Sequence, residues 1–493
     1  MTRATSRGEQ GLEVGAGRRT LVVGLGDTGL SVARYLARHG EPVLVVDSRP
    51  RPPGLDALRA ACPAVPIVLE SLDPRWLEGA GRVALSPGLG LDLPLVTEAR
   101  RRGLEIVGDI ELFARAATAP VLAVTGSNGK STAVTLAARM LAAAGYDAPA
   151  GGNLGPPALE LLEPEKPLGR PDFYVLEISS FQMETTESLR PRAAAVLNVS
   201  ADHLDRHGCV ERYAALKAKL LEAAEAAVFN LDDPLVREMA FDCARPVPFS
   251  VRTPLERGYS IVTRNGRRWL ARDGRPLLAA DELSLSGTHN EANALAALAL
   301  VAAASPELDE AFARAKPTLA SISAAGRGAD AATDSAGAPK LDGLLTALMT
   351  FEGLPHRCRR VAVRAGVLYI DDSKGTNVGA SIAAIEGLAG PLVLIAGGIG
   401  KGADFAPLAE SARGKVKAAV LIGRAAAELE QALAGVCRTQ RAADMPSAVQ
   451  AAAALAQSGD TVLLSPACAS QDQFRDYRHR GEIFAAAVEA LPA

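Results

Sequence analysis

The sequence predicts an α/β protein of three domains, each built on a mainly parallel sheet covered by helices. From residue 20 to about residue 145, apolar β-branched runs alternate with Ala- and Leu-rich stretches of helical period, as in strands joined by crossover helices. The same alternation returns at residues 391–395, 418–422 and 461–464. The chain has 493 residues, of which 48% are hydrophobic, enough for about three packed domains.

The charge balance and the cysteines exclude several classes of protein. Lys and Arg number 53 against 56 Asp and Glu, with no basic block along the chain, which argues against nucleic-acid binding. The six cysteines form no C-x-x-C pair, which fits a reducing compartment better than a disulfide framework or zinc site. No export signal or apolar run of membrane-spanning length is visible. We therefore expect a cytoplasmic enzyme without a membrane span.

The first chemical motif is a glycine-rich turn near the amino terminus. Residues 21–29 read LVVGLGDTG, and a helix is expected from Leu30 to about His39. Such glycines let the backbone approach a phosphate at a helix N-terminus. A second strand ends in Asp47-Ser48-Arg49, where an acidic side chain usually reaches a ribose hydroxyl. Taken alone, the pattern suggests an NAD-dependent dehydrogenase; a tight turn that binds nothing is the alternative, and the nucleotide stays open.

A second loop carries a stronger phosphate signal. An apolar strand at residues 120–124 runs into TGSNGKST at 125–132, and a helix is expected over residues 134–144. Backbone N–H groups and the helix dipole would face phosphates, Lys130 would neutralise β and γ oxygens, and Ser131 would ligate Mg²⁺. Val124 stands where the first glycine of such loops is usual. A chance turn is nevertheless the weaker alternative, because a strand and a helix flank the loop as phosphate binding requires. The predicted ATP-binding residues are Gly126, Ser127, Asn128, Gly129, Lys130, Ser131 and Thr132.

Polar side chains follow further strands, at the edge where α/β sites are built. Glu177 ends an apolar strand that should lie beside the phosphate loop, and it is a candidate Mg²⁺ ligand. His203, within NVSADHLDRHG at residues 198–208, is a candidate metal ligand, although a loop histidine is more often a surface or hydrogen-bonding residue. Lys217, read from its surroundings alone, is expected to be an exposed helix lysine.

Two later segments extend the nucleotide interpretation. Asn290 and Asn293 lie three apart at the start of an Ala-rich helix, where their amides either read an adenine edge or cap the helix. Arg357, Asp372 and Lys374 flank a strand of the third domain, and a fixed cation beside a carboxylate suits a γ-phosphate in transfer. Residues 321–340 contain almost no large apolar side chain, so we expect a flexible insert there.

Taken together and in order, these motifs resemble the Mur ligase family of peptidoglycan synthesis. The resemblance runs through most of the chain and includes GLGDTGLS, TGSNGKST, LEISSFQ, NVSADHLDRHG, DDSKGTN and LSPACASQDQF. The first eighteen residues and the 321–340 insert look foreign to the family pattern, and Gly375, Ile399 and Gly402 depart from it in detail. The pattern is closest to the family member that uses D-glutamate, and the D-N-P-R signature of the diaminopimelate-adding member is missing.

The resemblance implies a ligase with a flexible extension at 1–18, a Rossmann-like UDP-binding domain at 19–113, a P-loop domain at 114–353 and a Rossmann-like amino-acid domain at 354–493. It implies a monomer that joins D-glutamate to UDP-N-acetylmuramoyl-L-alanine through an acyl phosphate, using ATP and two Mg²⁺ ions. UDP replaces NAD in the first domain. Lys217 would carry a CO₂-derived carbamate and ligate Mg²⁺, which reverses the prediction of an exposed lysine.

The resemblance also assigns individual residues. The implied catalytic residues are Lys130, Glu177, His203, Lys217 and Lys374. The implied metal ligands are Ser131, Glu177, His203 and the carbamate of Lys217. The loop residues named above, with Asn290, Asn293, Arg357 and Asp372, would bind ATP. The UDP substrate would contact Asp27, Thr28, Asp47, Ser48, Arg49, Ser86 and Asn153, and D-glutamate would contact Thr376, Lys401, Ser465 and Phe474.

Three alternatives stay open from the sequence. The chain could be a sister ligase that adds L-alanine or diaminopimelate, or a folylpolyglutamate-type ligase. It could also be a nucleotide-binding regulator that has kept the fold without the activity. The joint presence of Glu177, His203, Lys217 and Asp372 speaks against the regulator, because a protein that only binds a nucleotide does not need a second metal site.

Overall fold

The computed structural model describes residues 19–162, 170–240, 243–285, 287–314, 341–388 and 390–492. The predicted extension at 1–18 and the predicted insert at 321–340 therefore lie outside the described residues. The chain divides into two compact units: unit 1 contains Met1–Thr118, Gly155–Gly169 and Phe181–Leu189, and unit 2 contains Ala119–Leu154, Arg170–Ser180 and Arg190–Ala493.

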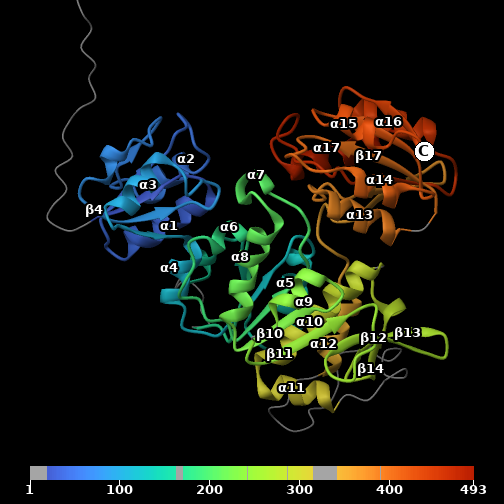
Figure 1. Ribbon diagram of the computed structural model, residues 1–493, viewed down its shortest axis with the longest axis horizontal. Coiled ribbons are helices and arrows are strands. Elements are labelled where there is room, and N and C mark those ends of the chain that lie inside the picture. The colour runs from blue at the N-terminus through green and yellow to red at the C-terminus, as the bar shows by residue number, and fades with distance from the viewer. Residues whose placement is uncertain are drawn as a thin grey trace, which may run out of the picture. The chain divides into compact units, whose positions relative to one another are not determined.

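Unit 1 is built on a parallel five-stranded sheet of order β3-β2-β1-β4-β5, drawn in blue in Figure 1. Its central strands β1 (Arg19–Val23) and β2 (Val43–Val46) are almost wholly buried, as in sheets covered on both faces. Helix α1 (Asp27–Arg38) begins three residues before the predicted Leu30, and Asp27 in its first turn complements the helix dipole. The other elements are α2 (Leu55–Ala61), β3 (Ile67–Val68), η1 (Pro74–Leu77), β4 (Ala80–Leu85), α3 (Pro94–Arg101), β5 (Glu105–Val107), α4 (Asp109–Ala116) and η2 (Ala158–Leu162).

The first sheet of unit 2 has nine strands in the order β14-β13-β12-β11-β10-β9-β6-β8-β7. It is parallel from β7 to β12, and the last two strands add an antiparallel hairpin. The strands are β6 (Val121–Thr125), β7 (Ala150–Gly152), β8 (Tyr174–Glu177), β9 (Ala193–Val196), β10 (Ala226–Asn230), β11 (Pro246–Ser250), β12 (Tyr259–Arg264), β13 (Arg267–Arg272) and β14 (Arg275–Ala279).

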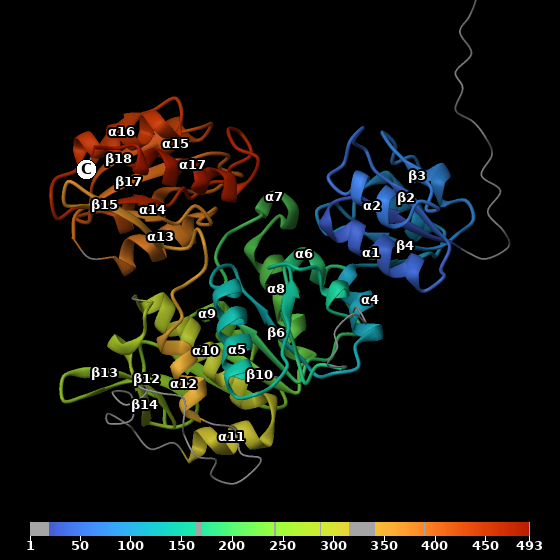
Figure 2. The ribbon, with the colours of Figure 1, turned by 180° about the vertical axis from the view of Figure 1, so that it is seen from behind.

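Helices cover the nine-stranded sheet and pack against its apolar side chains. The helices are α5 (Lys130–Ala143), α6 (Ser180–Met183), which ends in unit 1, α7 (Leu204–His207), α8 (Val210–Glu222), α9 (Pro234–Met239), η3 (Ala280–Glu282), α10 (Thr288–Ala304), α11 (Pro306–Ala313) and α12 (Leu341–Met349). Helices α5, α10 and α12 pack together (Figure 2) and share one hydrophobic cluster with Leu122 and Val124 of β6. Ala123 lies outside that cluster and is buried, because successive strand residues face opposite sides of a sheet.

The second sheet of unit 2 has six strands in the order β15-β16-β20-β17-β18-β19, all parallel except the edge strand β15. Leu394 and Ile395 of β17 are both fully buried and belong to different hydrophobic clusters, so helices cover both faces. The elements are β15 (Arg359–Arg364), β16 (Val367–Asp371), α13 (Val378–Gly387), β17 (Leu392–Gly397), α14 (Ala406–Ala412), β18 (Val416–Ile422), α15 (Ala426–Ala432), β19 (Arg438–Arg441), α16 (Met445–Leu455), β20 (Thr461–Leu464) and α17 (Tyr477–Glu489).

Three mainly parallel sheets covered by helices confirm the predicted α/β fold class. The predicted domain boundaries stay predictions.

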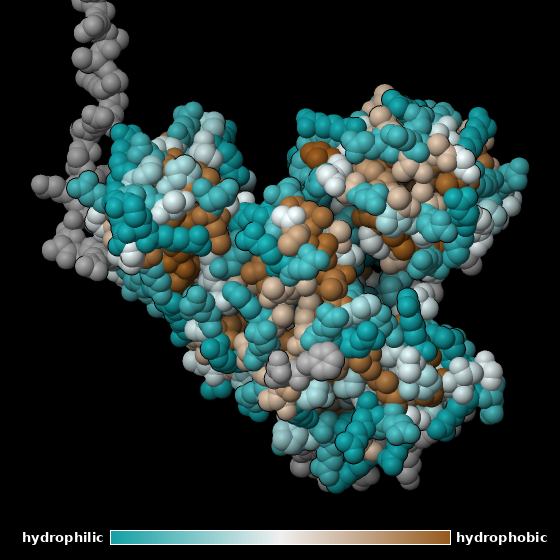
Figure 3. All heavy atoms as spheres, in the orientation of Figure 1, coloured by the Kyte–Doolittle hydropathy of each residue, from teal (hydrophilic) through white to brown (hydrophobic). Residues whose placement is uncertain are grey.

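Hydrophilic residues dominate the face drawn in Figure 3. Among the described residues, Val363 is the large apolar side chain that is exposed, at 42%. No described helix has the length and apolar character needed to cross a bilayer.

Candidate active site

The loop after β6 forms a tight phosphate-type turn. Gly126 and Gly129 have φ angles of +152° and +82°, which side chains other than glycine rarely adopt. A Cβ atom at Gly129 would lie 2.2 Å from Asn293 Oδ1, so the loop and α10 approach closely there. Lys130 folds back over the loop and donates from Nζ to the carbonyls of Gly126 (2.8 Å) and Ser127 (3.0 Å). The predicted strand–loop–helix context is confirmed, with α5 beginning at Lys130 rather than Val134.

Glu177 lies beside this loop, because β8 pairs in parallel with β6 as expected. It is 2% exposed and accepts hydrogen bonds from Ser131 Oγ (2.5 Å) and Asn153 Nδ2 (2.6 Å). Burial alone would raise the pKa of Glu177, but the charges of Lys130 and Arg357 and these two hydrogen bonds hold it below its usual range. The carboxylate is therefore ionised and faces the position of Ser131.

The oxygen atoms around Ser131 suit a magnesium ion held partly by phosphate. Among the described residues, no three His, Cys, Asp or Glu side chains form a metal cage by themselves. Mg²⁺ usually takes one or two carboxylates, with phosphate oxygens and water in its other positions. Ser131 and Glu177 supply donors of this type, so the residues fit the ion in that role.

Lys217 is buried, which makes the prediction of an exposed helix lysine wrong. It is 1% exposed on α8, and its Nζ lies 3.0 Å from the carbonyl of Gly126 and 4.2 Å from the ring centre of Tyr213. Lys130 and Lys217 thus donate to the same carbonyl oxygen. Burial, reinforced by the charge of Lys130, lowers the pKa of Lys217 well below its usual value.

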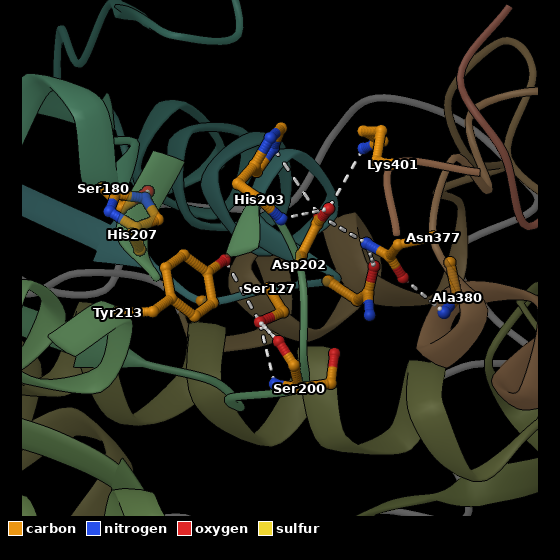
Figure 4. A network of polar contacts seen from close by, with 12 residues as sticks. Ser127, Ser180, Ser200, Asp202, His203, His207, Tyr213, Asn377, Ala380 and Lys401 are labelled. Carbon is orange, nitrogen blue, oxygen red and sulfur yellow. Dashed lines mark hydrogen bonds and ion pairs between the residues drawn. The ribbon is translucent and has the colours of Figure 1, made fainter. Parts of the chain in front are cut away.

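His203 belongs to a network of polar residues from loops of both sheets of unit 2 (Figure 4). Its Nε2 lies 3.6 Å from Asp202, and Asp202 also accepts hydrogen bonds from Lys401 Nζ (3.0 Å) and Asn377 Nδ2 (2.9 Å). Burial lowers the pKa of His203. Neither Asp202 nor Asn377 was predicted as a site residue. Asn377 also caps α13, accepting from Ala380 N at 2.8 Å, and a capping role is all that its sequence position suggests.

Part of the phosphate loop lines a cavity of about 1000 Å³. Its lining includes the predicted nucleotide residues Asn128, Gly129, Thr132, Asn290, Asn293, Arg357, Asp372 and Lys374. Asn293 is buried and its Nδ2 lies 3.4 Å from Asn290 Oδ1, which places both amides on one helical face as predicted. Arg357 Nη2 donates to Ser131 Oγ at 2.7 Å, joining the segment before β15 to the start of α5. The lining residues Asp232 and Arg268 lie in no motif that the sequence singled out, whereas His289 precedes Asn290 in the motif at the start of α10.

Asp372 lines this cavity, and the pKa of its carboxyl group is raised. The carboxyl is buried and accepts hydrogen bonds from Ser465 Oγ (2.7 Å) and Cys358 N (3.2 Å). Burial raises its pKa from an ordinary value of 3.8 to about 7.

We predict that Asp372 makes the stability of the folded protein fall as the pH rises from about 4 to about 7. In this window the folded state retains a proton that the unfolded chain has released, because the folded pKa of Asp372 is the higher one. Asp372→Asn removes this contribution. The Tm of the natural protein minus that of the variant should therefore increase from about pH 8 to about pH 5 in nucleotide-free protein. Parallel Tm profiles would refute the assignment.

The residues predicted to meet D-glutamate come from three loops of the six-stranded sheet. Thr376 follows β16, Lys401 follows β17, and Ser465 and Phe474 follow β20. Lys401 faces Asp202, whereas Ser465 is fully buried against Asp372 and Ser381. Lys374, in the same loop as Thr376, lies 3.8 Å from the ring centre of Tyr477. The strand ends thus lie at one edge of the sheet, as the parallel topology requires.

In unit 1, Asp47 holds Arg49 instead of presenting a free carboxylate. It is 2% exposed and accepts hydrogen bonds from Arg49 N, Nε and Nη2 and from Leu25 N, at 2.7–2.9 Å. Burial would raise the pKa of Asp47, but the hydrogen bonds from Arg49 keep it low. Both oxygens are occupied, which weakens the NAD interpretation, in which this carboxylate reaches a ribose. The Arg49 side chain is 48% exposed.

The remaining predicted UDP residues surround the glycine turn, except Asn153. Asp27 and Thr28 begin α1, Ser48 lies between Asp47 and Arg49, and Ser86 Oγ donates to the carbonyl of Gly24 at 3.1 Å. Asn153 belongs to unit 2 and contacts Glu177 there.

We predict that Gly29→Ala destabilises unit 1 by about 1–3 kcal/mol. A Cβ atom at Gly29 would lie 1.9 Å from the carbonyl oxygen of Gly24, so strand and helix would have to separate. Gly26→Ala is the matched control in the same turn, because a Cβ at Gly26 meets nothing within 4 Å. Calorimetry should show a lower Tm for Gly29→Ala and little change for Gly26→Ala. Equal Tm values for the two variants would contradict the packing argument.

Fold and site together define a multidomain P-loop α/β protein, in which Asn128 and Ser131 of the phosphate loop accept hydrogen bonds from Asn377 and Arg357, residues that flank strands of the six-stranded sheet. Three family models match the chain: "Mur ligase MurD-like, N-terminal domain" at residues 18–108, "Mur ligase middle domain" at 124–301 and "Mur ligase, glutamate ligase domain" at 356–468. The chain belongs to the Mur ligase family.

Sequence relatives agree with this membership, and a solved structure agrees with the fold. A UDP-N-acetylmuramoylalanine--D-glutamate ligase of Methylococcus capsulatus is 45% identical, covering 96% of this chain and 95% of its own. A protein of the same name from Pseudomonas aeruginosa is 44% identical, covering 96% and 98%. The structure of the UDP-N-acetylmuramate-alanine ligase of Thermotoga maritima, 17% identical, aligns with a TM-score of 0.58 over 96% of this chain and 99% of that one. At that identity the structural likeness supports the fold alone.

Proposed function

We propose that this protein joins D-glutamate to UDP-N-acetylmuramoyl-L-alanine at the expense of ATP, in peptidoglycan precursor synthesis. The observation that carries the proposal is the 44–45% identity, over 96% of the chain, to relatives named for that reaction. The geometry of unit 2 adds support, because a phosphate loop, a buried carboxylate and two lysines meet at Gly126 and Ser131. The cytoplasmic location and the monomeric state stay predictions.

The proposed reaction has two steps. A carboxylate oxygen of the L-alanyl group attacks the γ-phosphorus of ATP, and the bond to ADP breaks, giving an acyl phosphate. The neutral amine of D-glutamate then attacks the acyl carbon, loses a proton, and expels inorganic phosphate as the amide bond forms. Each step brings anions together, so the protein must supply positive charge and exclude water.

The residues of unit 2 divide this work. Lys130 and Arg357 would neutralise the transferred phosphoryl group, and Lys374 lines the same cavity as Arg357. Ser131, Glu177, His203 and a carbamate on Lys217 would hold Mg²⁺, which screens phosphate charge when bound. Asn290 and Asn293 would contact the adenine. Thr376, Lys401, Ser465 and Phe474 would form the D-glutamate site, and Arg49 would meet the UDP phosphates in unit 1.

Phosphate release from ATP tests the function directly. With UDP-N-acetylmuramoyl-L-alanine present, we expect release that depends on D-glutamate and not on L-glutamate, L-alanine or diaminopimelate. Release with a different amine would make the protein a sister ligase. Absence of release with every amine, in protein that binds ATP, would favour the regulator.

A further inference from the structure

Arg480, near the start of α17, is among the largest side chains that the described residues bury completely. The sequence suggests nothing special about it, because one arginine in the first turn of a terminal helix is usually solvated. Burying a charged group is costly unless its hydrogen bonds are satisfied. A fully buried guanidinium therefore needs an explanation from its contacts.

All the hydrogen bonds from this guanidinium to described residues go to uncharged oxygens. Nη2 donates to the carbonyl of Ser373 (2.7 Å), and Nε donates to the hydroxyl of Ser373 (3.0 Å). Nη1 donates to the carbonyl of Cys468 (3.1 Å) and, at 3.4 Å, to that of Gly397. The Ser373 hydroxyl in turn donates to the carbonyl of Tyr477 (2.7 Å), which ties the group back to α17.

These three carbonyls belong to three neighbouring strand ends. Ser373 follows β16, Gly397 ends β17, and Cys468 follows β20, and the sheet order places β20 between the other two. The loops that begin there carry the residues proposed to meet D-glutamate: Thr376, Lys401, and the pair Ser465 and Phe474. The planar guanidinium of Arg480 thus links all three loops of the proposed amino-acid site.

The charge of Arg480 is not neutralised locally. Asp371, Asp372 and Asp472 influence it through their charges, but none of them accepts one of its hydrogen bonds. Burial lowers its pKa to about 10, so it stays protonated at neutral pH. An apolar side chain of similar volume would avoid the cost of a buried charge, but it would take these donors away from the three carbonyls. The fork of five N–H donors is what only arginine supplies.

We propose that Arg480 is a positioning residue that sets the relative placement of the three loops forming the amino-acid site. It does not touch the substrate; it acts through Ser373, Gly397 and Cys468. This inference rests on the proposed function, because it names the same site as the one that receives D-glutamate.

Steady-state kinetics of the full-length variant Arg480→Lys test the inference. Lysine keeps the charge but cannot bridge three carbonyls as a planar fork. We expect the KM for D-glutamate to rise roughly ten- to a hundredfold, while the KM for ATP rises severalfold less, because among the described residues no hydrogen bond joins this arginine to the phosphate loop. Arg441→Lys is the control, since Arg441 lies in an exposed ion pair with Glu430 in the same domain.

The outcomes separate positioning from stability. An unchanged KM for D-glutamate with a lower Tm, or an equal rise in both KM values, would overturn the inference. If Arg480→Lys does not fold, Ser373→Ala carries the test, because it removes the Nε acceptor and should raise the same KM to a smaller extent. If the natural protein releases no phosphate with D-glutamate, the proposed function fails first, and the KM of whichever amine it accepts becomes the readout for Arg480.

Discussion

Lys130→Ala is expected to abolish ATP-dependent ligation, lowering phosphate release by at least about a thousandfold. The Lys130 ammonium group lies directly over the phosphate loop, on the carbonyls of Gly126 and Ser127. Burial lowers the pKa of Lys130, but the charge of Glu177 opposes that effect. A cation placed in advance costs no reorganisation when negative charge develops on the transferred phosphoryl group, and alanine leaves that charge uncompensated.

The control for this variant must separate loss of phosphate binding from loss of backbone contacts. Lys415→Ala does so, because Lys415 Nζ also donates to backbone carbonyls, those of Ile385, Glu386 and Leu388, at 2.8–3.3 Å. It should lose stability at most. Phosphate release is measured with all three substrates, and folding is checked by circular dichroism. Near-normal turnover in Lys130→Ala would refute the assignment of this loop to ATP.

Much of the fold follows from patterns that a single sequence displays. The strand Thr461–Leu464 and the end of β8 at Glu177 agree with the prediction, because buried parallel strands are short apolar runs and polar residues stop them. The helix starts were placed too late at α1 and α5, where Asp27 and Lys130 are already helical. Glycine-rich turns obscure the first helical turn, since loop and helix share the same polar residues.

Contacts distant in sequence could not be predicted in this way. The burial of Lys217 depends on Gly126 and Tyr213, and a helix lysine carries no local sign of what packs on it. The same holds for Arg480, whose three carbonyl partners come from three loops. The carboxylate of Asp47 likewise accepts a hydrogen bond from Leu25 N, which lies 22 positions away in the sequence. Side-chain environment is a tertiary property, whereas period and spacing describe local structure.

Lys217→Met is expected to lower ligation by roughly a hundredfold or more, if a carbamate on this residue supplies a ligand for Mg²⁺. Lys217 meets the conditions for carbamate formation: its accepting partner is a carbonyl rather than a carboxylate, and burial lowers its pKa well below the usual value. A neutral amine attacks CO₂, whereas an ammonium group cannot, so the buried site favours the reactive form. The product is an anion, which would sit beside Lys130 and gain from its charge.

Dependence of activity on carbon dioxide distinguishes the carbamate from an unmodified lysine. Removing CO₂ and bicarbonate should lower phosphate release by the natural protein, and adding bicarbonate should restore it. Lys217→Met should be insensitive to both changes. Lys219→Ala is the matched control, because Lys219 lies on the same helix and is exposed. This variant should retain both full activity and the response to CO₂.

A carbamate carbon signal from labelled bicarbonate, present in the natural protein and absent from Lys217→Met, would place the modification on Lys217. Activity of the natural protein that is indifferent to CO₂, together with no such signal, would leave Lys217 as an unmodified lysine that shares the carbonyl of Gly126 with Lys130. The second metal site would then lack its proposed ligand.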